Sequence, residues 1–298
     1  MTRLRWGVLG AAWIAGRAVL PAIAASNNGD LVVLASRDPE RAKRMAAPYE
    51  GVRIAASYEA VLEDESVDAV YIPLVNSLHM EWTLRTLAAG KHVLCEKPLG
   101  LNAEQAETMA GAALASGKKL MEAFMYRFHP AMRAFVEQVR DPLHVRASFG
   151  FPVKDAANCR LDAAVGGGAL LDVGCYTVDV ARWILGEPDR VLAHTRLGNG
   201  VDMSVSALLE FPGQRTASLW ASFETPEQQD LVVVTRDVVH RRQPAFTAWH
   251  DPDDPYQLMV ESFADSVLHD EPVAISPDES IANMKVLDRI REAASATR

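Results

Sequence analysis

The chain has 298 residues, 49% of them hydrophobic, which is enough apolar sequence for two domains with a large core. Its formal net charge is −9 and no basic run occurs, so we expect no nucleic-acid partner. The three cysteines and the His, Asp and Glu residues show neither disulfide nor metal-ligand spacing, so no metal site is predicted. Because the sequence shows no signal peptide and no apolar stretch of membrane-spanning length, we expect a cytoplasmic protein without a membrane partner.

Residues 1–122 alternate between strand and helix patterns, which is typical of a parallel sheet built from β-α-β units in an α/β fold. The predicted strands are Leu4–Leu9, Leu31–Ser36, Ala69–Ile72, His92–Cys95 and Lys119–Glu122. The predicted helices are Ile14–Ser26, Pro39–Ala47, Leu78–Ala89 and Ala103–Ser116. Near residue 122 the alternation of short strands and helices gives way to longer alternating stretches, without a flexible linker. This change marks the end of the first predicted domain.

Residues 123–298 form the second predicted domain, an α/β domain in which longer alternating stretches indicate an open, largely antiparallel sheet with one covered face. Its predicted strands are Leu143–Phe151, Arg190–Leu197, Val201–Phe211, Thr216–Phe223 and Leu231–Thr235. Its predicted helices include Pro130–Val139, Tyr256–His269 and Pro277–Ala294. We expect the tryptophans of this domain, Trp183, Trp220 and Trp249, to belong to the core.

A glycine-containing turn follows the first predicted strand and opens the first predicted helix. Counted from Gly10, alanines stand at the second and third glycine positions of a G-x-G-x-x-G pattern, at Ala12 and Ala15. Alanine still permits backbone N–H groups to approach a pyrophosphate closely. The turn therefore suits a dinucleotide, although S-adenosylmethionine, or no ligand at all, is equally compatible with this motif alone.

The end of the second predicted strand distinguishes between the two nicotinamide dinucleotides. The chain reads Ser36-Arg37-Asp38-Pro39, with Arg41 one helical turn further on. A serine and two arginines suit a ribose 2′-phosphate, which favours NADP(H) over NAD(H). Asp38 leaves an alternative open, because it could bind the ribose of NAD or cap the helix that begins at Pro39.

A lysine follows the short apolar strand His92–Cys95, in the sequence Cys95-Glu96-Lys97-Pro98. Ligands bind at the carboxyl end of strands in open α/β sheets. By itself Lys97 is a solvated surface cation or a group that faces the ligand, but Pro98 fixes the backbone next to it. We therefore treat Lys97 as a candidate site residue.

A second candidate constellation lies in Gly166–Tyr176, where three glycines precede an apolar helix. Asp172 and Tyr176 are four residues apart and are therefore neighbours on one helix face. An ammonium about 4 Å from a phenol interacts with it by about 4 kcal/mol at an effective dielectric near 20, equivalent to about three pKa units. Lys97 could thus tune Tyr176 for acid/base catalysis, and we expect Asp172 to bind a substrate hydroxyl or to pair with Lys97.

These residues resemble the Gfo/Idh/MocA oxidoreductase family over essentially the whole chain. The strongest matches are Glu96-Lys97-Pro98, Glu122–Pro130, and Gly166–Tyr176 with Asp179 beyond it. The resemblance implies a Rossmann domain, a second domain whose open sheet commonly forms a homodimer or homotetramer contact, and hydride transfer between NAD(P) and a sugar, polyol or diol-like substrate.

Carried over by position, the resemblance gives catalytic roles to Lys97, Asp172 and Tyr176 and substrate-binding roles to Tyr126, Asn158 and Asp172. The residues that it places on the cofactor side are Gly10, Ala12, Trp13, Ile14, Ser36, Arg37, Arg41, Pro73, Asn76, His79, Glu96 and Lys97. A non-catalytic NADP(H)-binding regulator on the same fold is the alternative function.

Two features depart from the common family pattern. Many members have histidine at the position of Tyr176, and tyrosine there is similar to the branch of dihydrodiol dehydrogenases, D-xylose dehydrogenases and glucose–fructose oxidoreductase. The chain is also short between Phe223 and Phe246, which affects the predicted sheet edge and the oligomer contact there.

Overall fold

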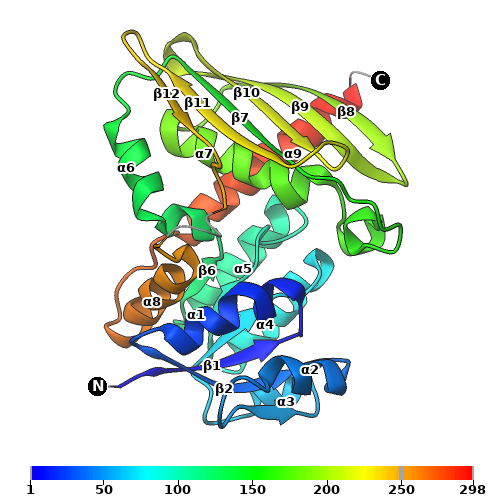
Figure 1. Ribbon diagram of the computed structural model, residues 1–298, viewed down its shortest axis with the longest axis vertical. Coiled ribbons are helices and arrows are strands. Elements are labelled where there is room, and N and C mark those ends of the chain that lie inside the picture. Colours follow the sequence, from blue (N-terminus) through cyan, green and yellow to red (C-terminus); the bar gives the residue numbers. More distant parts are fainter. Residues whose placement is uncertain (1, 248–251, 297–298) are drawn as a thin grey trace. The chain divides into compact units, whose positions relative to one another are not determined.

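The computed structural model describes residues 2–247 and 252–296, which form two compact units (Figure 1). The first unit comprises Met1–Leu99, Glu104–Phe128 and Asp251–Ser280, and the second comprises Gly100–Ala103, His129–His250 and Ile281–Arg298. The chain thus returns to the first unit near its end, a return that the predicted division at residue 122 does not include. Trp249 lies outside the described residues.

The first unit is built on a six-stranded parallel sheet with the strand order β3-β2-β1-β4-β5-β6, the order of a doubly wound dinucleotide-binding domain. The strands are β1 (Leu4–Leu9), β2 (Gly29–Ala35), β3 (Arg53–Ala55), β4 (Ala69–Ile72), β5 (His92–Cys95) and β6 (Leu120–Glu122). The five strands expected from the sequence are confirmed, with ends that differ by at most two residues. The parallel Rossmann-type sheet is therefore confirmed.

Short helical segments connect these strands. They are η1 (Ala15–Val19), α1 (Leu20–Ala25), α2 (Pro39–Ala46), α3 (Tyr58–Leu62), η2 (Asn76–Leu78), α4 (His79–Ala88), α5 (Ala103–Ser116) and η3 (Met125–Phe128). Helix α3 and strand β3 were not expected from the sequence, because segments of five and three residues are too short to show a hydrophobic period.

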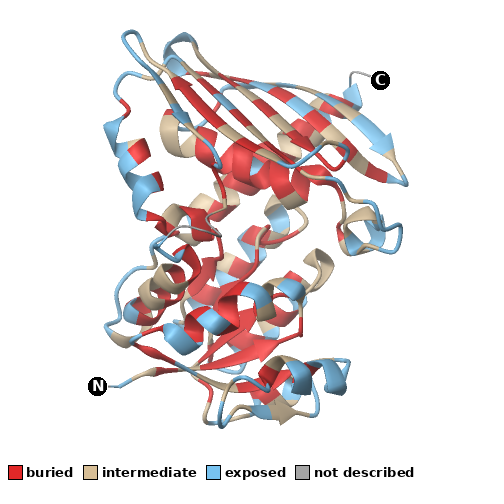
Figure 2. Cartoon of the chain, in the orientation of Figure 1, coloured by how far each residue is buried: buried red, intermediate tan, exposed pale blue. Residues whose placement is uncertain are grey.

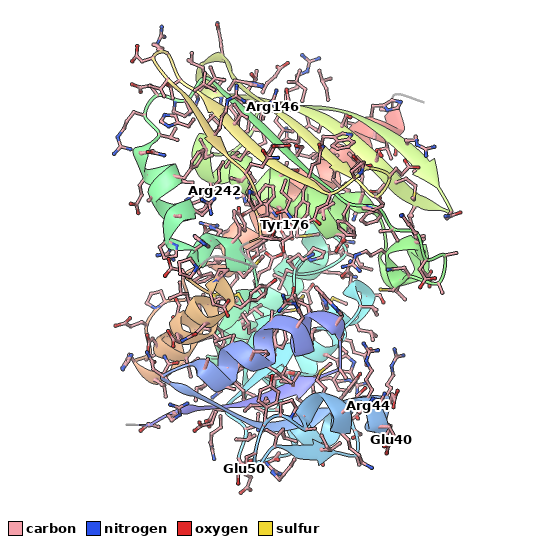
Figure 3. All side chains as sticks on the ribbon, viewed as in Figure 1. Glu40, Arg44, Glu50, Arg146, Tyr176 and Arg242 are labelled. Atoms are coloured by element: carbon pink, nitrogen blue, oxygen red, sulfur yellow. The ribbon has the colours of Figure 1, made fainter. Side chains whose placement is uncertain are left out.

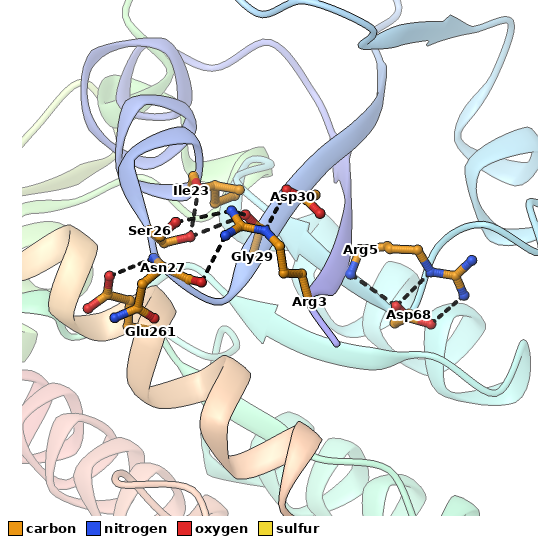
Figure 4. A network of polar contacts seen from close by, with 9 residues as sticks. All are labelled: Arg3, Arg5, Ile23, Ser26, Asn27, Gly29, Asp30, Asp68 and Glu261. Carbon is orange, nitrogen blue, oxygen red and sulfur yellow. Dashed lines mark hydrogen bonds and ion pairs between the residues drawn. The ribbon is translucent and has the colours of Figure 1, made fainter. Parts of the chain in front are cut away.

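Helix α8 (Pro255–Leu268) completes the core of the first unit although it lies far along the sequence. The fully buried ring of Trp6 on β1 stacks at a tilt on Phe263, with 5.4 Å between the ring centroids. The turn before β2 is also tied to this helix, because the Asn27 backbone N–H donates to Glu261 Oε1 at 3.0 Å (Figure 4). The first unit therefore needs α8 to close its core.

The second unit contains a six-stranded sheet with the order β12-β11-β7-β10-β9-β8. Its strands are β7 (His144–Gly150), β8 (Arg190–Gly198), β9 (Val201–Phe211), β10 (Arg215–Ser222), β11 (Gln228–Val234) and β12 (Val239–Arg242). The predicted largely antiparallel sheet is confirmed, with one exception, since β7 and β10 pair in parallel. Strand β12, which the sequence analysis missed, is the edge strand in the short stretch between Phe223 and Phe246.

One face of this second sheet is covered by helices. The helices of this part of the chain are α6 (Pro130–Gln138), η4 (Cys159–Leu161), η5 (Ala163–Val165), η6 (Leu170–Gly174), α7 (Cys175–Leu185), η7 (Pro212–Gln214) and α9 (Pro277–Ala296). Burial alternates along β9 (Figure 2). Leu208 on its outer face is exposed. Trp183 and Trp220 are only half-buried, so they lie at the margin of the core and not at its centre.

Within the described residues one segment, Ala163–Leu185, is long and apolar enough to suit a membrane span, with a mean hydropathy of 1.2. The sequence analysis did not register it because Asp172 and Asp179 interrupt the apolar run. Since 72% of the most apolar part of this segment is buried within the protein, we interpret the segment as the central helix of the second unit.

We predict that acid destabilises the first unit through His92 on β5. Its Nδ1 accepts a hydrogen bond from the Lys119 backbone N–H at 3.0 Å, so protonation at Nδ1 would break a contact between β5 and the start of β6. Burial lowers the pKa of His92 to about 4, with help from the neighbouring Lys118 and Lys119. The unfolded chain therefore takes up this proton at a higher pH than the native protein.

Accordingly, the free energy of unfolding should fall as the pH drops from the ordinary histidine pKa towards 4. Urea titrations across this range measure the effect. A His92→Gln variant should show a shallower pH dependence, and an unchanged slope in that variant would contradict the assignment.

Candidate functional site

The turn after β1 brings backbone close to the carboxyl edge of the sheet. Gly10 has φ +107°, and its N–H donates to the Ala35 carbonyl at the end of β2 at 2.7 Å. A Cβ on Gly10 would lie 2.8 Å from Leu74 Cδ2, so no larger residue fits without a shift. Ala12, Trp13 and Ile14 follow and lead into η1, where backbone N–H groups suit a pyrophosphate.

The end of β2 carries the cationic residues predicted to bind the 2′-phosphate. Ser36 is half-buried, whereas Arg37 and Arg41 are exposed. Asp38 is the N-cap of α2, because its Oδ1 accepts a hydrogen bond from the Arg41 backbone N–H at 3.0 Å. Of the two roles that the sequence allowed for Asp38, the structure shows the helix cap.

The ends of β4 and β5 lie side by side, since Ile72 pairs with Cys95. Pro73 and Asn76 follow β4, and Glu96 and Lys97 follow β5. These four residues therefore come together at the carboxyl edge of the sheet, and the Lys97–Pro98 peptide bond is cis.

His79 and Glu96 hold these two strand ends in place. The ring nitrogens of the fully buried His79 lie 2.8 Å from the Pro98 carbonyl and 3.0 Å from the Leu74 carbonyl. Burial lowers the pKa of His79, and Lys97 lowers it further. The buried Tyr71 hydroxyl donates to Glu96 Oε1 at 2.7 Å. His79 therefore joins the loops that follow β4 and β5.

Tyr126, expected on the substrate side, belongs to η3 just after β6 in the first unit. Its ring is 2% exposed and meets Phe124 edge-on, with 6.1 Å between centroids. Tyr126 is thus a well-packed aromatic group.

The second unit carries Asn158, Asp172 and Tyr176. Asn158 caps η4, with its side chain accepting from the Arg160 backbone N–H at 3.0 Å. Arg160 in turn donates from Nε to Asp172 Oδ2 at 2.6 Å, and its guanidinium lies over the Phe151 ring. The carboxylate expected to bind a hydroxyl or Lys97 thus has Arg160 as a partner, which the sequence analysis did not foresee.

Tyr176 lies on α7, on the helix-covered side of the sheet, whereas Arg146 of β7 points from the opposite face (Figure 3). Its ring contacts Phe149 and Phe246, with centroid separations of 5.4 and 5.6 Å. The side chain is only 6% exposed. Aromatic packing therefore fixes the direction of the phenol, and the Arg160 charge lies close enough to interact with it.

The glycine segment before this helix is positioned by Asp202 of β9, another residue that the sequence analysis missed. Asp202 Oδ2 accepts a hydrogen bond from the Leu170 backbone N–H at 2.5 Å, and burial raises the pKa of this carboxyl. Gly168 has φ +119° and lies directly against the carboxylate, so a side chain there would collide with it. No sequence pattern links residues on a loop and a distant strand.

The structure thus groups the candidate residues in two sets. The first unit contains the residues predicted on the cofactor side, which include Lys97, and it also contains Tyr126. The second unit contains Asn158, Asp172 and Tyr176. Among residues 2–247 and 252–296 no group of three or more His, Cys, Asp or Glu side chains could hold a metal ion.

Two family models match the chain. The first, an oxidoreductase family with an NAD-binding Rossmann fold, covers residues 4–124, and the second, the GFO/IDH/MocA C-terminal domain, covers residues 137–237. Residues 238–298 lie outside both matches.

Individual relatives agree with the family match. The chain is 39% identical to D-xylose 1-dehydrogenase (NADP(+)) 2 of Haloferax volcanii, covering 98% of this chain and 97% of the relative. It is 35% identical to the dTDP-3,4-didehydro-2,6-dideoxy-alpha-D-glucose 3-reductase of Actinomadura kijaniata, covering 98% of this chain and 96% of that one.

Solved structures extend the similarity to three dimensions. A 3-ketoreductase from Actinomadura kijaniata, in complex with NADP and TDP-benzene, superimposes with a TM-score of 0.86 at 31% identity and covers 98% of both chains. Crystal structures of that ketoreductase include one lysine-to-alanine variant and one tyrosine-to-phenylalanine variant.

Proposed function

Since this chain belongs to the Gfo/Idh/MocA oxidoreductase family, we propose that it is an NADP(H)-dependent enzyme acting on a sugar, polyol or diol-like substrate. Its relatives are dehydrogenases and reductases, so the chain is an oxidoreductase of hydroxyl and carbonyl groups. A bound nicotinamide cofactor supplies or accepts the hydride in this chemistry.

The observation that carries the proposal is the presence of a lysine, a carboxylate and a phenol at the positions to which the family resemblance gives catalytic roles. Lys97 stands at the carboxyl edge of the first sheet, and Asp172 and Tyr176 stand on the central helix of the second unit. A regulator that only senses NADP(H) has no need of this acid/base set. The lysine and tyrosine variants made in the related ketoreductase concern the same two residue types.

The preference for NADP(H) rests on the end of β2. Asp38 is engaged as a helix cap, whereas Ser36, Arg37 and Arg41 provide a hydroxyl and two guanidinium groups. Guanidinium groups pair with phosphate oxygens, while NAD enzymes usually place a carboxylate here for the ribose hydroxyl. The NADP named for both the xylose dehydrogenase and the ketoreductase structure supports the same choice.

In the proposed mechanism Tyr176 is the general acid and base. During reduction its hydroxyl gives a proton to the substrate carbonyl oxygen, and during oxidation its phenolate takes the hydroxyl proton. In this proposal Lys97 has the role of favouring the phenolate form of Tyr176 electrostatically. Asp172 accepts a hydrogen bond from a substrate hydroxyl and is kept in place by Arg160.

We expect that Arg160→Met raises KM for the substrate about tenfold or more, because a charge-assisted hydrogen bond to Asp172 is lost. The carboxylate, without its counter-charge, should also raise the phenol pKa and move the pH optimum upward. Steady-state kinetics over a pH range measure both effects.

Arg190→Met is the matched control, since it breaks an exposed ion pair with Glu210 in the same unit and should leave KM unchanged. An Arg160→Met enzyme with wild-type KM and pH profile would refute the role of the pair.

The function itself is tested by NADPH and NADP absorbance assays with a panel of aldoses, polyols, diols and dicarbonyls. We expect turnover in at least one direction, with NADP(H) preferred over NAD(H). Tight NADPH binding by calorimetry without turnover of any substrate would instead support the non-catalytic regulator.

A further inference from the structure

The helix that carries Tyr176 begins with a wide turn. Leu170–Gly174 form the π-helical turn η6, a type of turn in which backbone hydrogen bonds join residues five apart, and α7 starts directly after it at Cys175. Compared with a continuous α-helix, a turn of this width changes the angle around the helix axis between Asp172 and Tyr176. The direction of the Tyr176 side chain therefore depends on how this turn is held.

Side-chain donors contact backbone carbonyl groups where the wide turn meets α7. Thr177 Oγ1 donates a hydrogen bond to the Gly174 carbonyl at 2.8 Å. A second donor comes from α9, where Asn283 Nδ2 donates to the Cys175 carbonyl at 3.2 Å. That carbonyl belongs to the peptide group that joins Cys175 to Tyr176. Asn283 therefore holds the backbone directly next to the residue that carries the phenol.

The amide of Asn283 is buried in a mainly apolar part of the second unit. The residue is 1% exposed, and Met284 and Leu287 beside it on α9 are fully buried. A leucine of similar size would avoid the cost of burying an amide at such a position. The hydrogen bond to the Cys175 carbonyl therefore accounts for a polar residue here.

Helix α9 runs beside α7 and is attached to it near both of its ends (Figure 1). Beyond the end of α7, Arg289 Nη1 donates to the Pro188 carbonyl at 2.7 Å. Asn283 makes the other attachment, the one next to Tyr176. The two bonds come from one helix, so they allow a structural contribution to be separated from a contribution to catalysis.

We propose that Asn283 is a positioning residue for proton transfer by Tyr176. By holding the peptide group before Tyr176, it keeps the phenol in the direction set by the packing of Phe149 and Phe246. A small displacement of a proton donor from the reacting oxygen slows the reaction strongly. The residues predicted to bind the cofactor belong to the first unit, so NADPH binding does not depend on Asn283. The inference rests on the proposed acid/base role of Tyr176.

The test is a double-mutant cycle on kcat, with the full-length enzyme, NADPH or NADP, and the aldose, polyol, diol or dicarbonyl that turns over fastest. Asn283→Leu removes the donor and nearly keeps the volume, so we expect kcat to fall about tenfold while Kd for NADPH stays unchanged. In a Tyr176→Phe background, adding Asn283→Leu should have no further effect on kcat. Asn283→Gln, which keeps the carboxamide donor, should recover most of the lost kcat.

Two further variants control the cycle. Arg289→Met removes the other bond between α9 and the region of α7, and its kcat should equal that of wild type. Thr177→Val removes the donor to the Gly174 carbonyl with almost no change of shape, and it replaces Asn283→Leu in the cycle if that variant does not fold. Its loss of kcat should likewise vanish in the Tyr176→Phe background.

A further loss of kcat when Asn283→Leu is added to Tyr176→Phe would show a merely structural role and overturn the inference. Wild-type kcat in Asn283→Leu, or an equal loss in Arg289→Met, would overturn it as well. A wild-type protein that turns over no compound of the panel, or a Tyr176→Phe enzyme with wild-type kcat, would refute the proposed function or its mechanism and this inference with it. Only those last two results concern the proposed function, so the failures are distinguishable.

Discussion

Replacing Tyr176 by phenylalanine is expected to lower kcat by a factor of about 10² to 10⁴, the usual contribution of a positioned general acid. The substitution removes only the hydroxyl, and the ring keeps its contacts with Phe149 and Phe246. Stability and NADPH binding should therefore stay close to wild type. Single-turnover kinetics, thermal unfolding and calorimetry measure the three quantities.

The control for this variant is Tyr49→Phe, which removes the hydroxyl of a half-buried tyrosine in the first unit and should keep full activity. If Tyr176→Phe retains wild-type kcat over the whole pH range, the phenol transfers no proton and another group must act as the acid. A large loss of thermal stability would instead show that the hydroxyl serves the core.

Replacing Lys97 by methionine should have the second large effect, because in the proposed mechanism it removes the charge that favours the Tyr176 phenolate while keeping a long side chain. An ammonium–phenolate pair near 4 Å interacts by about 4 kcal/mol. Without that interaction, the part of the pH profile that reflects ionisation of the Tyr176 phenol should move to higher pH by up to about three units. Turnover at neutral pH should fall accordingly. The measurement is the pH profile of kcat/KM.

Lys97→Arg keeps the charge and should restore most of the pH profile, even if its bulk reduces kcat. Lys118→Met removes a lysine from the opposite end of the same sheet and should change neither the pH profile nor kcat. A Lys97→Met enzyme whose KM for NADPH rises while its pH profile stays fixed would show that the lysine binds cofactor and does not tune Tyr176.

Much of the fold follows from local patterns in the sequence. The strands of the first sheet are short apolar runs between turn residues, and α2 begins where Asp38 and Pro39 predict it. Strand β3 has no fully buried residue and β12 is an exposed edge strand, so neither carries a strong apolar signal. The parallel pairing of β7 with β10 was not predictable, because alternation along a strand does not specify the direction of its neighbour.

Parts of the candidate site were predictable where all residues of a motif lie in one continuous segment. The Gly10 turn and the Ser36–Arg41 segment are two such motifs. The Arg160 partner of Asp172 was not predictable, because Arg160 lies twelve residues earlier, in the separate three-residue helix η4. Likewise, His79 bridges two loops whose proximity the pairing of β4 and β5 creates. The shared role of Lys97 and Tyr176 remains a prediction.

Helix α8 lies late in the sequence but belongs to the first unit, so the first unit cannot be produced alone as one continuous fragment. A fragment that stops at residue 128 would lack Phe263 and leave the indole of Trp6 uncovered. It would also lose the carboxylate of Glu261 that receives the Asn27 N–H. We expect such a truncation to aggregate, whereas a fusion that joins it to residues 252–280 through a flexible tether should yield a monodisperse protein suitable for nucleotide titrations.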